Sequence, residues 1–374
     1  MNERITIFVG LDVHKASIVA AYSIGFGEVQ SLGNIGTRQC DLDRLCKRMQ
    51  SKGADVRFVY EAGPTGYAVY RYLCKKGFAC TVCAPSLIPR KPGDRVKTDR
   101  RDAIKLVKGL RMDDLSPVHV PDVTDEALRD LVRAWGAAKR DLHKARQRLK
   151  GFLLMHDVRY TGRANWSPAH RRWLSEFVFA QAWSQIAFQE HRQAIEDRLA
   201  QCERLEAALR EAAPQWRWYP VVQAIQALRG VQFSVAISVI AEIGDLSRFD
   251  HPRQLMAWLG VTPSEHSTGA SRRLGGITKA GNTYARKMLV EAAWSYRYAP
   301  KVSRIIQTRH EGLPKPIIDR AWDAQLRLCG RYRRMTAHGK LPTVAVVAVA
   351  RELAAFIWDI ARMTPVPASA RTTS

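Results

Sequence analysis

Apolar residues in the first part of the chain form short β-rich runs separated by stretches with helical spacing. The β-rich runs predict five strands, at 5–10, 17–22, near Val29, at 56–60 and at 79–84. The stretches with helical spacing predict three helices, at 42–49, 67–73 and 97–111. Residues 1–115 are therefore expected to form an α/β domain.

The order of these elements narrows the fold class. Three consecutive strands precede strands that alternate with helices, and this is the order seen in ribonuclease-H-like folds. Pro117 and Pro121 then mark a linker, and Thr124 is expected to cap the helix that follows it.

The stretch 122–213 is predicted to be a helical connector. It is polar, has helical spacing and is interrupted near 160–162. Its second half carries an apolar seam with heptad-like spacing, made of Ile195, Leu199, Cys202, Leu205 and Leu209. Two interpretations stay open, a helical hairpin or arm that mediates self-association and a plain helical spacer.

The rest of the chain is predicted to be mainly helical. Residues 214–300 contain a strongly apolar segment, 225–243, and then a polar, glycine-rich segment, 263–282. Residues 301–363 form a basic helical extension, in which cations lie near Tyr332. Such a mixture suits single-stranded nucleic acid, although a solvated helix face explains it as well. The tail 364–374 is expected to be disordered.

Composition adds a large positive charge to this picture. The 374 residues include 59 Lys and Arg against 35 Asp and Glu, a formal charge of +24, while 46% hydrophobic residues exclude disorder over the whole length. Such an excess favours a polyanionic partner, and nucleic acid is a commoner one than an anionic membrane surface. No run approaches the ~18 apolar residues of a membrane helix. Since the first residues also lack the layout of a signal peptide, we expect a cytoplasmic protein.

Seven cysteines are scattered along the chain, an odd number that fits reduced thiols. Cys80 and Cys83 form a lone CxxC pair without a second pair. Alternating residues of a buried strand explain this pair at least as well as zinc or redox chemistry does.

Four carboxylates stand at positions that suit a metal site. Asp12 follows the first predicted strand and Glu61 the fourth, and the carboxyl ends of strands face the functional edge of an α/β sheet. Asp99 and Asp102 are three apart on a predicted helix and so share a face. Four such groups would repel one another unless divalent cations neutralised them. Taken singly, each is also explained as a turn former or a solvated residue.

Oxygen ligands select Mg²⁺ or Mn²⁺ over zinc. Two such ions ~4 Å apart are suited to phosphodiester chemistry. Basic residues surround the acids and are predicted to contact nucleic acid, namely Lys15, Lys97, Arg100 and Arg101. His14 is expected either to contact a phosphate or to have a surface role.

The segment around Gly230 resembles a helix-hairpin-helix, in which backbone N–H groups of the turn point at a nucleic-acid phosphate. Gln232 occupies the place of the usual second glycine, and two helices packed around a tight turn are an equally simple explanation.

The glycine-rich segment offers hydroxyl groups on a flexible loop, with Ser267 as the candidate nucleophile. Cations that can grip a phosphate flank it, namely Arg272, Arg273, Lys279 and Arg286. A polar loop between helices is the alternative.

Four motifs in order, at 10–15, 60–62, 97–103 and 263–282, resemble the DEDD transposases of the insertion-sequence family one-ten, particularly its eleven-eleven branch. The resemblance runs from about residue 5 to residue 300. It implies a domain similar to the Holliday-junction resolvase RuvC, a helical connector and a C-terminal transposase domain. It places Asp12, Glu61, Asp99 and Asp102 on the metal-binding tetrad, and Ser267, with Thr268 as the alternative, on the nucleophile.

The resemblance also implies an activity and partners. Members excise and insert their own element, guided by a noncoding bridge or seek RNA that pairs with donor and target DNA. The serine forms a covalent phosphoserine intermediate, and strands exchange through a Holliday-like junction. Dimers that assemble into tetramers combine the acidic domain of one protomer with the serine domain of another. Two other functions stay open, a metal-dependent junction resolvase or nuclease without covalent chemistry and a non-catalytic nucleic-acid-binding protein.

Overall fold

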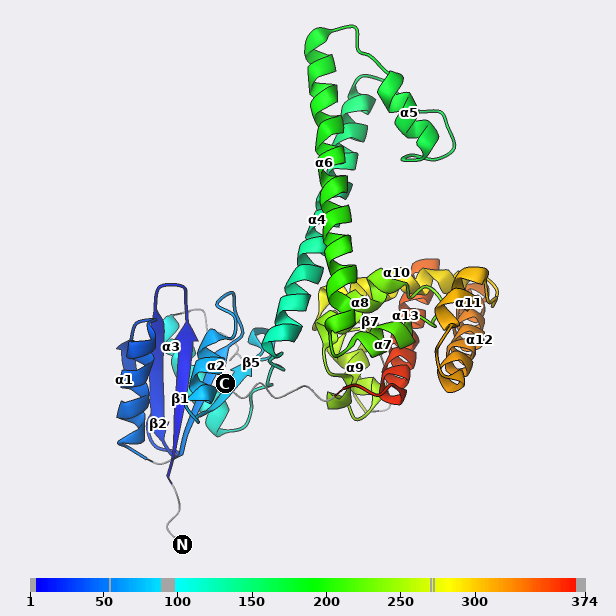
Figure 1. Ribbon diagram of the computed structural model, residues 1–374. Coiled ribbons are helices and arrows are strands. Elements are labelled where there is room, and N and C mark those ends of the chain that lie inside the picture. Colours follow the sequence, from blue (N-terminus) through cyan, green and yellow to red (C-terminus); the bar gives the residue numbers. More distant parts are fainter. Residues whose placement is uncertain (1–4, 54, 89–97, 270, 272, 368–374) are drawn as a thin grey trace. The chain divides into compact units, whose positions relative to one another are not determined.

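The structure is a computed structural model that describes residues 5–53, 55–88, 98–269, 271 and 273–367 (Figure 1). Three sequence predictions lie outside these residues, those for Lys97 and Arg272 and the end of the tail, 368–374. The chain divides into two compact units, Met1–Val120 and Pro121–Ser374. The four-part division of the chain stays a prediction.

The first unit is built on a mixed five-stranded sheet with the order β3-β2-β1-β4-β5. Its strands are β1 (Thr6–Val13), β2 (Ile18–Ile24), β3 (Gln30–Asn34), β4 (Asp55–Glu61) and β5 (Ala79–Cys83). The first three strands form an antiparallel meander, and β4 and β5 continue parallel to β1. The five predicted strands are confirmed.

Helices cover both faces of this sheet. Their bounds are α1 (Gln39–Gln50), α2 (Ala68–Lys75) and α3 (Asp99–Arg111). Apolar residues of α1 and α2 share one core with Ile7, Val9 and Leu11 of β1. Because successive residues of a strand point to opposite faces, Gly10 faces the other side, where α3 packs. A Cβ at Gly10 would lie 2.4 Å from the backbone oxygen of Ala103, so only glycine lets α3 approach this closely.

Three predicted boundaries were wrong. The strand β1 continues past its apolar run because Asp12 and Val13 still pair with β2, so Asp12 lies inside the strand rather than after it. The strand β3 begins after Val29 and includes Gly33. The helix α3 begins at Asp99, because Thr98 caps it by accepting a hydrogen bond from the N–H of Arg101.

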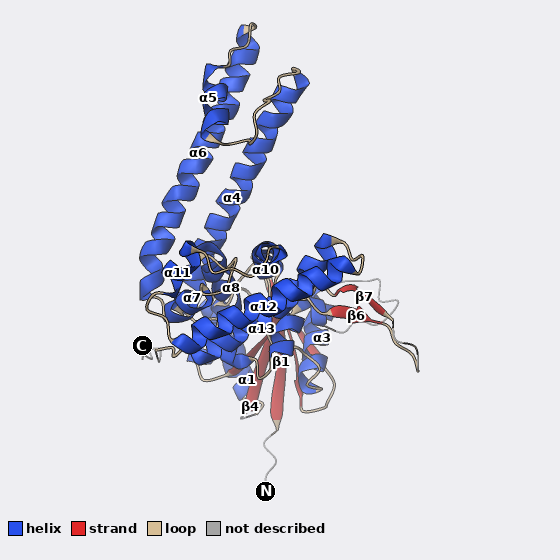
Figure 2. Ribbon diagram, turned by 90° about the vertical axis from the view of Figure 1, so that its right-hand side faces the viewer, coloured by secondary structure: helices blue, strands red, loops and turns tan. Residues whose placement is uncertain are grey.

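The second unit begins with a helical hairpin. Helices α4 (Val123–Met155) and α6 (Ala182–Ala212) run side by side, and α5 (Pro168–Glu176) lies near their far end (Figures 1 and 2). Four α6 side chains spaced seven apart are buried, namely Phe188, Ile195, Cys202 and Leu209. The predicted seam therefore packs within the chain, and self-association stays a prediction. Asp122, not Thr124, caps α4, since its Oδ1 accepts from the N–H of Asp125 at 2.7 Å.

Short and long helices make up the rest of the second unit. They are α7 (Tyr219–Ile225), α8 (Phe233–Ile243), α9 (Pro252–Trp258), α10 (Thr283–Ala293), α11 (Arg304–His310), α12 (Lys315–Ala337) and α13 (Pro342–Met363). One hydrophobic core runs from Leu128 of α4 to Ala361 of α13, so the basic extension shares a core with the segment before it. Val366 of the predicted tail also packs on this core. Across the described part of the chain, each helix is too short or too polar to cross a membrane.

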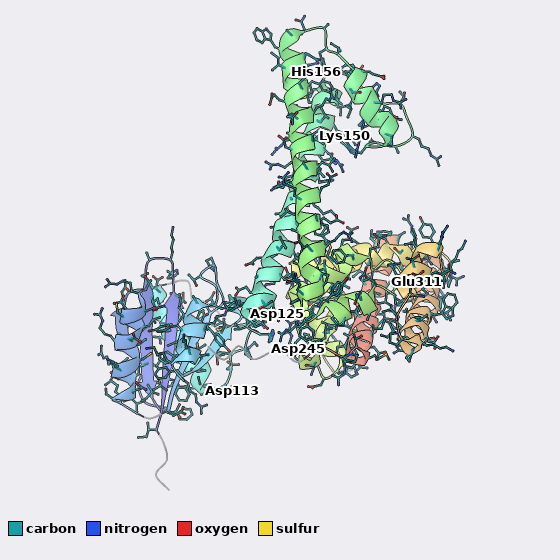
Figure 3. The ribbon with its side chains drawn as sticks, in the orientation of Figure 1. Asp113, Asp125, Lys150, His156, Asp245 and Glu311 are labelled. Atoms are coloured by element: carbon teal, nitrogen blue, oxygen red, sulfur yellow. The ribbon has the colours of Figure 1, made fainter. Side chains whose placement is uncertain are left out.

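A buried carboxylate joins the hairpin to the helical body. Asp125, near the start of α4 (Figure 3), is 3% exposed. It accepts hydrogen bonds from the indole N–H groups of Trp216, at 2.7 Å, and Trp218, at 3.4 Å. Arg217 completes the set with an ion pair to the same carboxylate. Two indole donors and one guanidinium group therefore compensate the buried charge of Asp125.

Removal of this carboxylate is expected to destabilise the second unit. Asp125→Ala leaves two buried indole donors without their acceptor and leaves Arg217 with Asp122 alone, which we expect to lower the free energy of unfolding by about 3 kcal/mol. Urea denaturation followed by circular dichroism measures this change. Asp130→Ala, at an exposed position on the same helix, is the control and should cost less than about 0.5 kcal/mol. Equal effects of the two variants would contradict the prediction.

Candidate functional site

The carboxyl ends of β1 and β4 bring two acids onto the same face of the sheet. The parallel pairing of these strands ends at Leu11 and Tyr60, so Asp12 and Glu61 are the next residues on neighbouring strands. Neighbouring strands lie about 4.8 Å apart, and residues in register point the same way. Asp12 is two residues beyond Gly10, and its side chain therefore points to the face covered by α3.

The first turn of α3 adds two more acids on that face. Asp99 and Asp102 lie in this turn, where the partial positive charge of the helix N-terminus favours carboxylates. Lys105 approaches Asp102, with Nζ 3.7 Å from Oδ1. The close contact of α3 with Gly10 therefore carries the acidic turn towards the end of β1.

A histidine that the sequence did not identify as a ligand joins this cluster. Nε2 of His14 lies 3.2 Å from Oδ2 of Asp12 and 3.7 Å from Oδ1 of Asp99. Ligand atoms of these three residues all lie within 4.8 Å of one another, a spacing that fits a metal ion. Glu61 and Asp102 are outside this group of three. The sequence could have identified His14 as a ligand, because it lies two residues after Asp12 at the end of a strand, where side chains two apart point to the same face.

The electrostatics of the cluster favour a bound cation. The side chain of Asp12 is 14% exposed, and its burial raises the pKa of the carboxyl above the ordinary value. His14 lowers this pKa, but burial together with the charges of Asp99 and Asp102 outweighs that effect. The folded protein thus bears a cost for ionising Asp12, which a divalent cation would offset. Carboxylate oxygens with one imidazole nitrogen are a donor set that Mn²⁺ accepts readily.

Two cysteines near Glu61 are structural. Cys80 and Cys83 are free thiols on β5, and they pack into different cores on opposite faces of the sheet. Burial, and to a smaller degree the Glu61 carboxylate, raises the pKa of Cys83 to about 12. The thiol is therefore protonated at neutral pH, and the interpretation of the CxxC pair as strand residues is confirmed.

Ser267 lies in the connection between the two strands of a β-hairpin in the second unit. The hairpin consists of β6 (Pro263–Glu265) and β7 (Leu274–Ile277). Beyond β6 the chains stay paired, because the N–H of His266 donates to the Arg273 carbonyl at 2.9 Å. Thr268 and Ser271 then exchange two backbone hydrogen bonds of 3.1 Å at the tip. The serine is therefore presented by a paired backbone.

A carboxylate stands next to the serine hydroxyl. Oγ of Ser267 donates a 2.8 Å hydrogen bond to Oε1 of Glu265, two residues earlier. Both side chains are exposed to solvent. Glu265 is not among the site residues predicted from the sequence, although a spacing of two in an extended segment places side chains on one side. This arrangement supplies an acceptor for the hydroxyl proton.

The base of the hairpin is tightly closed. Gly281 has φ +69°, and a Cβ there would lie 1.8 Å from the Trp258 backbone oxygen, so only glycine fits. Arg286 binds this base with one guanidinium nitrogen, donating to the carbonyls of Leu259 and Ala280 at 2.8 Å each. The structure thus shows a bracing role for Arg286, and its contact with nucleic acid stays a prediction.

A buried network fixes the same base to α8 and α4. Asn282 caps α10 and donates from Nδ2 to the Glu242 carboxylate at 2.6 Å. Arg133 of α4 holds that carboxylate with two hydrogen bonds of 2.7 and 2.8 Å. The hairpin with Ser267 therefore rises from a base anchored on both sides.

The other predicted nucleic-acid contacts are mostly exposed. Lys15, Arg100, Arg101, Arg273 and Lys279 are exposed to solvent. Gly230 is different: it lies in the turn between α7 and α8 with φ +80°, and a Cβ there would lie 2.3 Å from the Ala292 carbonyl oxygen. This turn packs against the end of α10 on one side.

Comparisons with known proteins agree with the geometry of both units. A DEDD transposase domain of the IS110 type matches residues 9–156, and the transposase IS116/IS110/IS902 family matches residues 222–307. A putative transposase, y4qE, of Sinorhizobium fredii is 45% identical over 95% of this chain and 88% of its own. The chain belongs to the IS110 family of transposases.

Two further relatives are named as transposases of insertion sequences. That for element IS1533 of Leptospira borgpetersenii is 29% identical over 88% of this chain and 96% of its own. That for IS1111A of Coxiella burnetii is 41% identical over 71 residues, 19% of this chain and 20% of its own. This IS110-family transposase is therefore a DNA-binding enzyme of transposition. Its DEDD domain implies a divalent metal, and the donor set around Asp12 fits one.

The unfavourable ionisation of Asp12 in the folded state predicts how the stability of the metal-free transposase depends on pH. Because folding raises the pKa of Asp12 above 3.8, its contribution to stability is present at low pH and is lost as the pH rises through the raised pKa. Asp12→Asn removes the charge, so with a chelator present the variant should be more stable than the natural protein at pH 7. The difference should vanish below pH 3.8.

Thermal denaturation across this pH range measures the effect. Added Mn²⁺ should raise the melting temperature of the natural protein and leave that of Asp12→Asn unchanged, since binding to the folded state stabilises it. A variant that is less stable at neutral pH would show that ionised Asp12 stabilises the fold.

Proposed function

We propose that this transposase is an RNA-guided recombinase that excises and inserts an insertion sequence through a covalent phosphoserine intermediate. The acidic cluster around Asp12 carries the proposal, because a divalent cation bound there would offset the cost of ionising carboxylates that lie so close together. The reaction takes place on DNA, which puts the enzyme in the bacterial cytoplasm.

The first unit is proposed to be a ribonuclease-H-like domain of the RuvC kind. The strand order β3-β2-β1-β4-β5, with an antiparallel meander and two parallel strands, supports this assignment. So does the position of the acids at the carboxyl ends of β1 and β4, where α/β sheets bind their ligands.

Asp12, Asp99 and His14 would hold a divalent ion, Mg²⁺ or Mn²⁺, and Glu61 and Asp102 would complete a site for two ions. Such ions polarise the scissile phosphate and stabilise the charge of the leaving oxygen. Thr98 and Gly10 position the acids of this site. Thr98 caps α3, and Gly10 lets α3 pack closely against β1, so that Asp99 and Asp102 lie near Asp12.

Ser267 is proposed to be the nucleophile. As Oγ attacks phosphorus, an Oγ–P bond forms and the bond from phosphorus to the leaving deoxyribose oxygen breaks, while the hydroxyl proton passes to Glu265. The leaving oxygen takes up a proton from solvent. Religation by a hydroxyl of another strand reverses these steps, and strands exchange through a Holliday-like junction. The 2.8 Å contact with Glu265 favours Ser267 over Thr268.

Base pairing by a bridge or seek RNA would select donor and target DNA, leaving backbone contacts to the protein. The formal charge of +24 suits this division of labour. Lys15, Arg100 and Arg101 would contact phosphates near the acids, and Arg273 and Lys279 near the serine. Dimers that assemble into tetramers would bring the acids of one protomer to the serine of another.

Loss of the acidic cluster should abolish recombination without loss of nucleic-acid binding. Asp12→Ala and Asp102→Ala are expected to eliminate excision of an element from a reporter plasmid in Mg²⁺ or Mn²⁺, because the ions lose their ligands. Asp114→Asn, an exposed acid beyond the other end of α3, is the control and should keep full activity. Normal excision by the cluster variants would refute the metal role of these acids.

The serine chemistry predicts a covalent protein–DNA adduct on denaturing gels. Ser267→Ala should remove the adduct, Thr268→Ala should retain it, and Glu265→Gln should slow its formation about 10²-fold through loss of the proton acceptor. An adduct that persists in Ser267→Ala and disappears in Thr268→Ala would identify Thr268 as the nucleophile. DNA cleavage without any adduct would instead identify a metal-dependent nuclease.

A further inference from the structure

Three arginines from three different helices converge at the far end of the helical hairpin. Arg146 of α4, Arg171 of α5 and Arg192 of α6 line one pocket. Among the described residues that line it, one carboxylate, Glu196, faces these three guanidinium groups. The pocket therefore has an excess of positive charge, in contrast to the buried carboxylates Asp125 and Glu242 of the same unit, which are each paired with an arginine.

Arg146 is a half-buried member of this arginine pocket. Its guanidinium lies over the ring of Trp166, 4.9 Å from the ring centre. Its Nε is buried and has no hydrogen-bond acceptor among the described residues. Burial lowers the pKa of Arg146, and the neighbouring charge of Arg171 lowers it further. An anion bound in the pocket would supply the acceptor that this donor lacks among the described residues.

Trp166, which lines this pocket, has a strained backbone conformation. Its φ is +64°, a left-handed backbone that a bulky aromatic residue rarely adopts. The conformation is held by two hydrogen bonds: the N–H of Trp166 donates to Nδ1 of His170 at 3.2 Å, and Ser167 caps α5. His170 is buried, and its burial lowers its pKa, so the neutral ring accepts this bond. The strain places the indole ring beneath Arg146.

The surroundings of the pocket match a nucleic acid. Between 139 and 150, helix α4 carries six Lys or Arg and one Asp, and apart from Arg146 these cations are exposed. Lys150 and His156 mark the end of this basic stretch near α5 (Figure 3). The forked N–H donors of arginine match the oxygens of a phosphate. An extended row of cations that leads to a half-buried arginine suits a chain of phosphates better than a single small anion.

We propose that the arginine pocket binds a phosphate group of a nucleic-acid backbone and so anchors the end of the hairpin on the nucleic acid. The anchor is separate from the acidic cluster and the serine hairpin, so its test does not depend on catalysis. Duplex DNA and folded RNA share this phosphate chemistry, and both are used as probes.

The experiment compares two double variants of the full chain that lose the same charge. Arg171→Gln with Arg192→Gln removes two arginines of the pocket. Arg172→Gln with Arg198→Gln removes exposed arginines that belong to the same two helices but do not line the pocket. Fluorescence anisotropy measures the affinity for a mixed-sequence duplex DNA and for a hairpin RNA over a range of salt concentrations.

The pocket variant should bind at least one of the two probes about tenfold more weakly, with a shallower dependence of log affinity on log salt by about one unit. The control variant should stay within about twofold on both probes. The probe with the larger loss identifies the source of the phosphate. Equal losses in the two variants would mean diffuse attraction and overturn the proposal, as would full affinity of a pocket variant with unchanged circular dichroism and melting temperature.

Discussion

The close contact between α3 and β1 is the constraint on which the acidic cluster depends. Because Gly10 has no side chain, the backbone of Ala103 comes so close to β1 that a Cβ at this position would lie 2.4 Å from the Ala103 oxygen. The first turn of α3 is thereby lowered onto the strand end. Asp12 and Asp99, which are almost ninety positions apart in the sequence, are thereby brought close enough for their charges to repel. His14 contacts both carboxylates.

In the second unit, the base of the β-hairpin holds the exposed hydroxyl of Ser267 in a defined position. A short hairpin of two strands has little stability by itself. Its base is closed by glycine at Gly281 and by the bonds of Arg286, and it is anchored through Asn282 to Glu242. Ser267 remains open to solvent, while the base is held by these packing contacts and hydrogen bonds. Rigidity at the base and access at the tip suit a nucleophile that attacks a large substrate.

Charge is distributed in this transposase in two distinct ways. The buried carboxylates of the second unit are matched closely, Asp125 by Arg217 and Glu242 by Arg133. The acidic cluster and the arginine pocket are instead unbalanced, with opposite signs. Unmatched charge at partly buried positions destabilises a protein unless a ligand compensates for it. This contrast separates the groups that stabilise the fold from those that bind ligands.

The sequence by itself determined the five strands and the helical character of the connector, because hydrophobic spacing is a local property. It also singled out Asp12 and Asp99, which the structure brings together. It did not show that Asp12 lies inside β1, since the pairing with Val19 of β2 extends the strand. Nor did it join His14 to Asp99, Glu265 to Ser267 or Arg146 to Trp166. Each of these contacts depends on backbone pairing or on helix packing between segments, and only the tertiary structure decides which side chains such packing brings within a few ångströms.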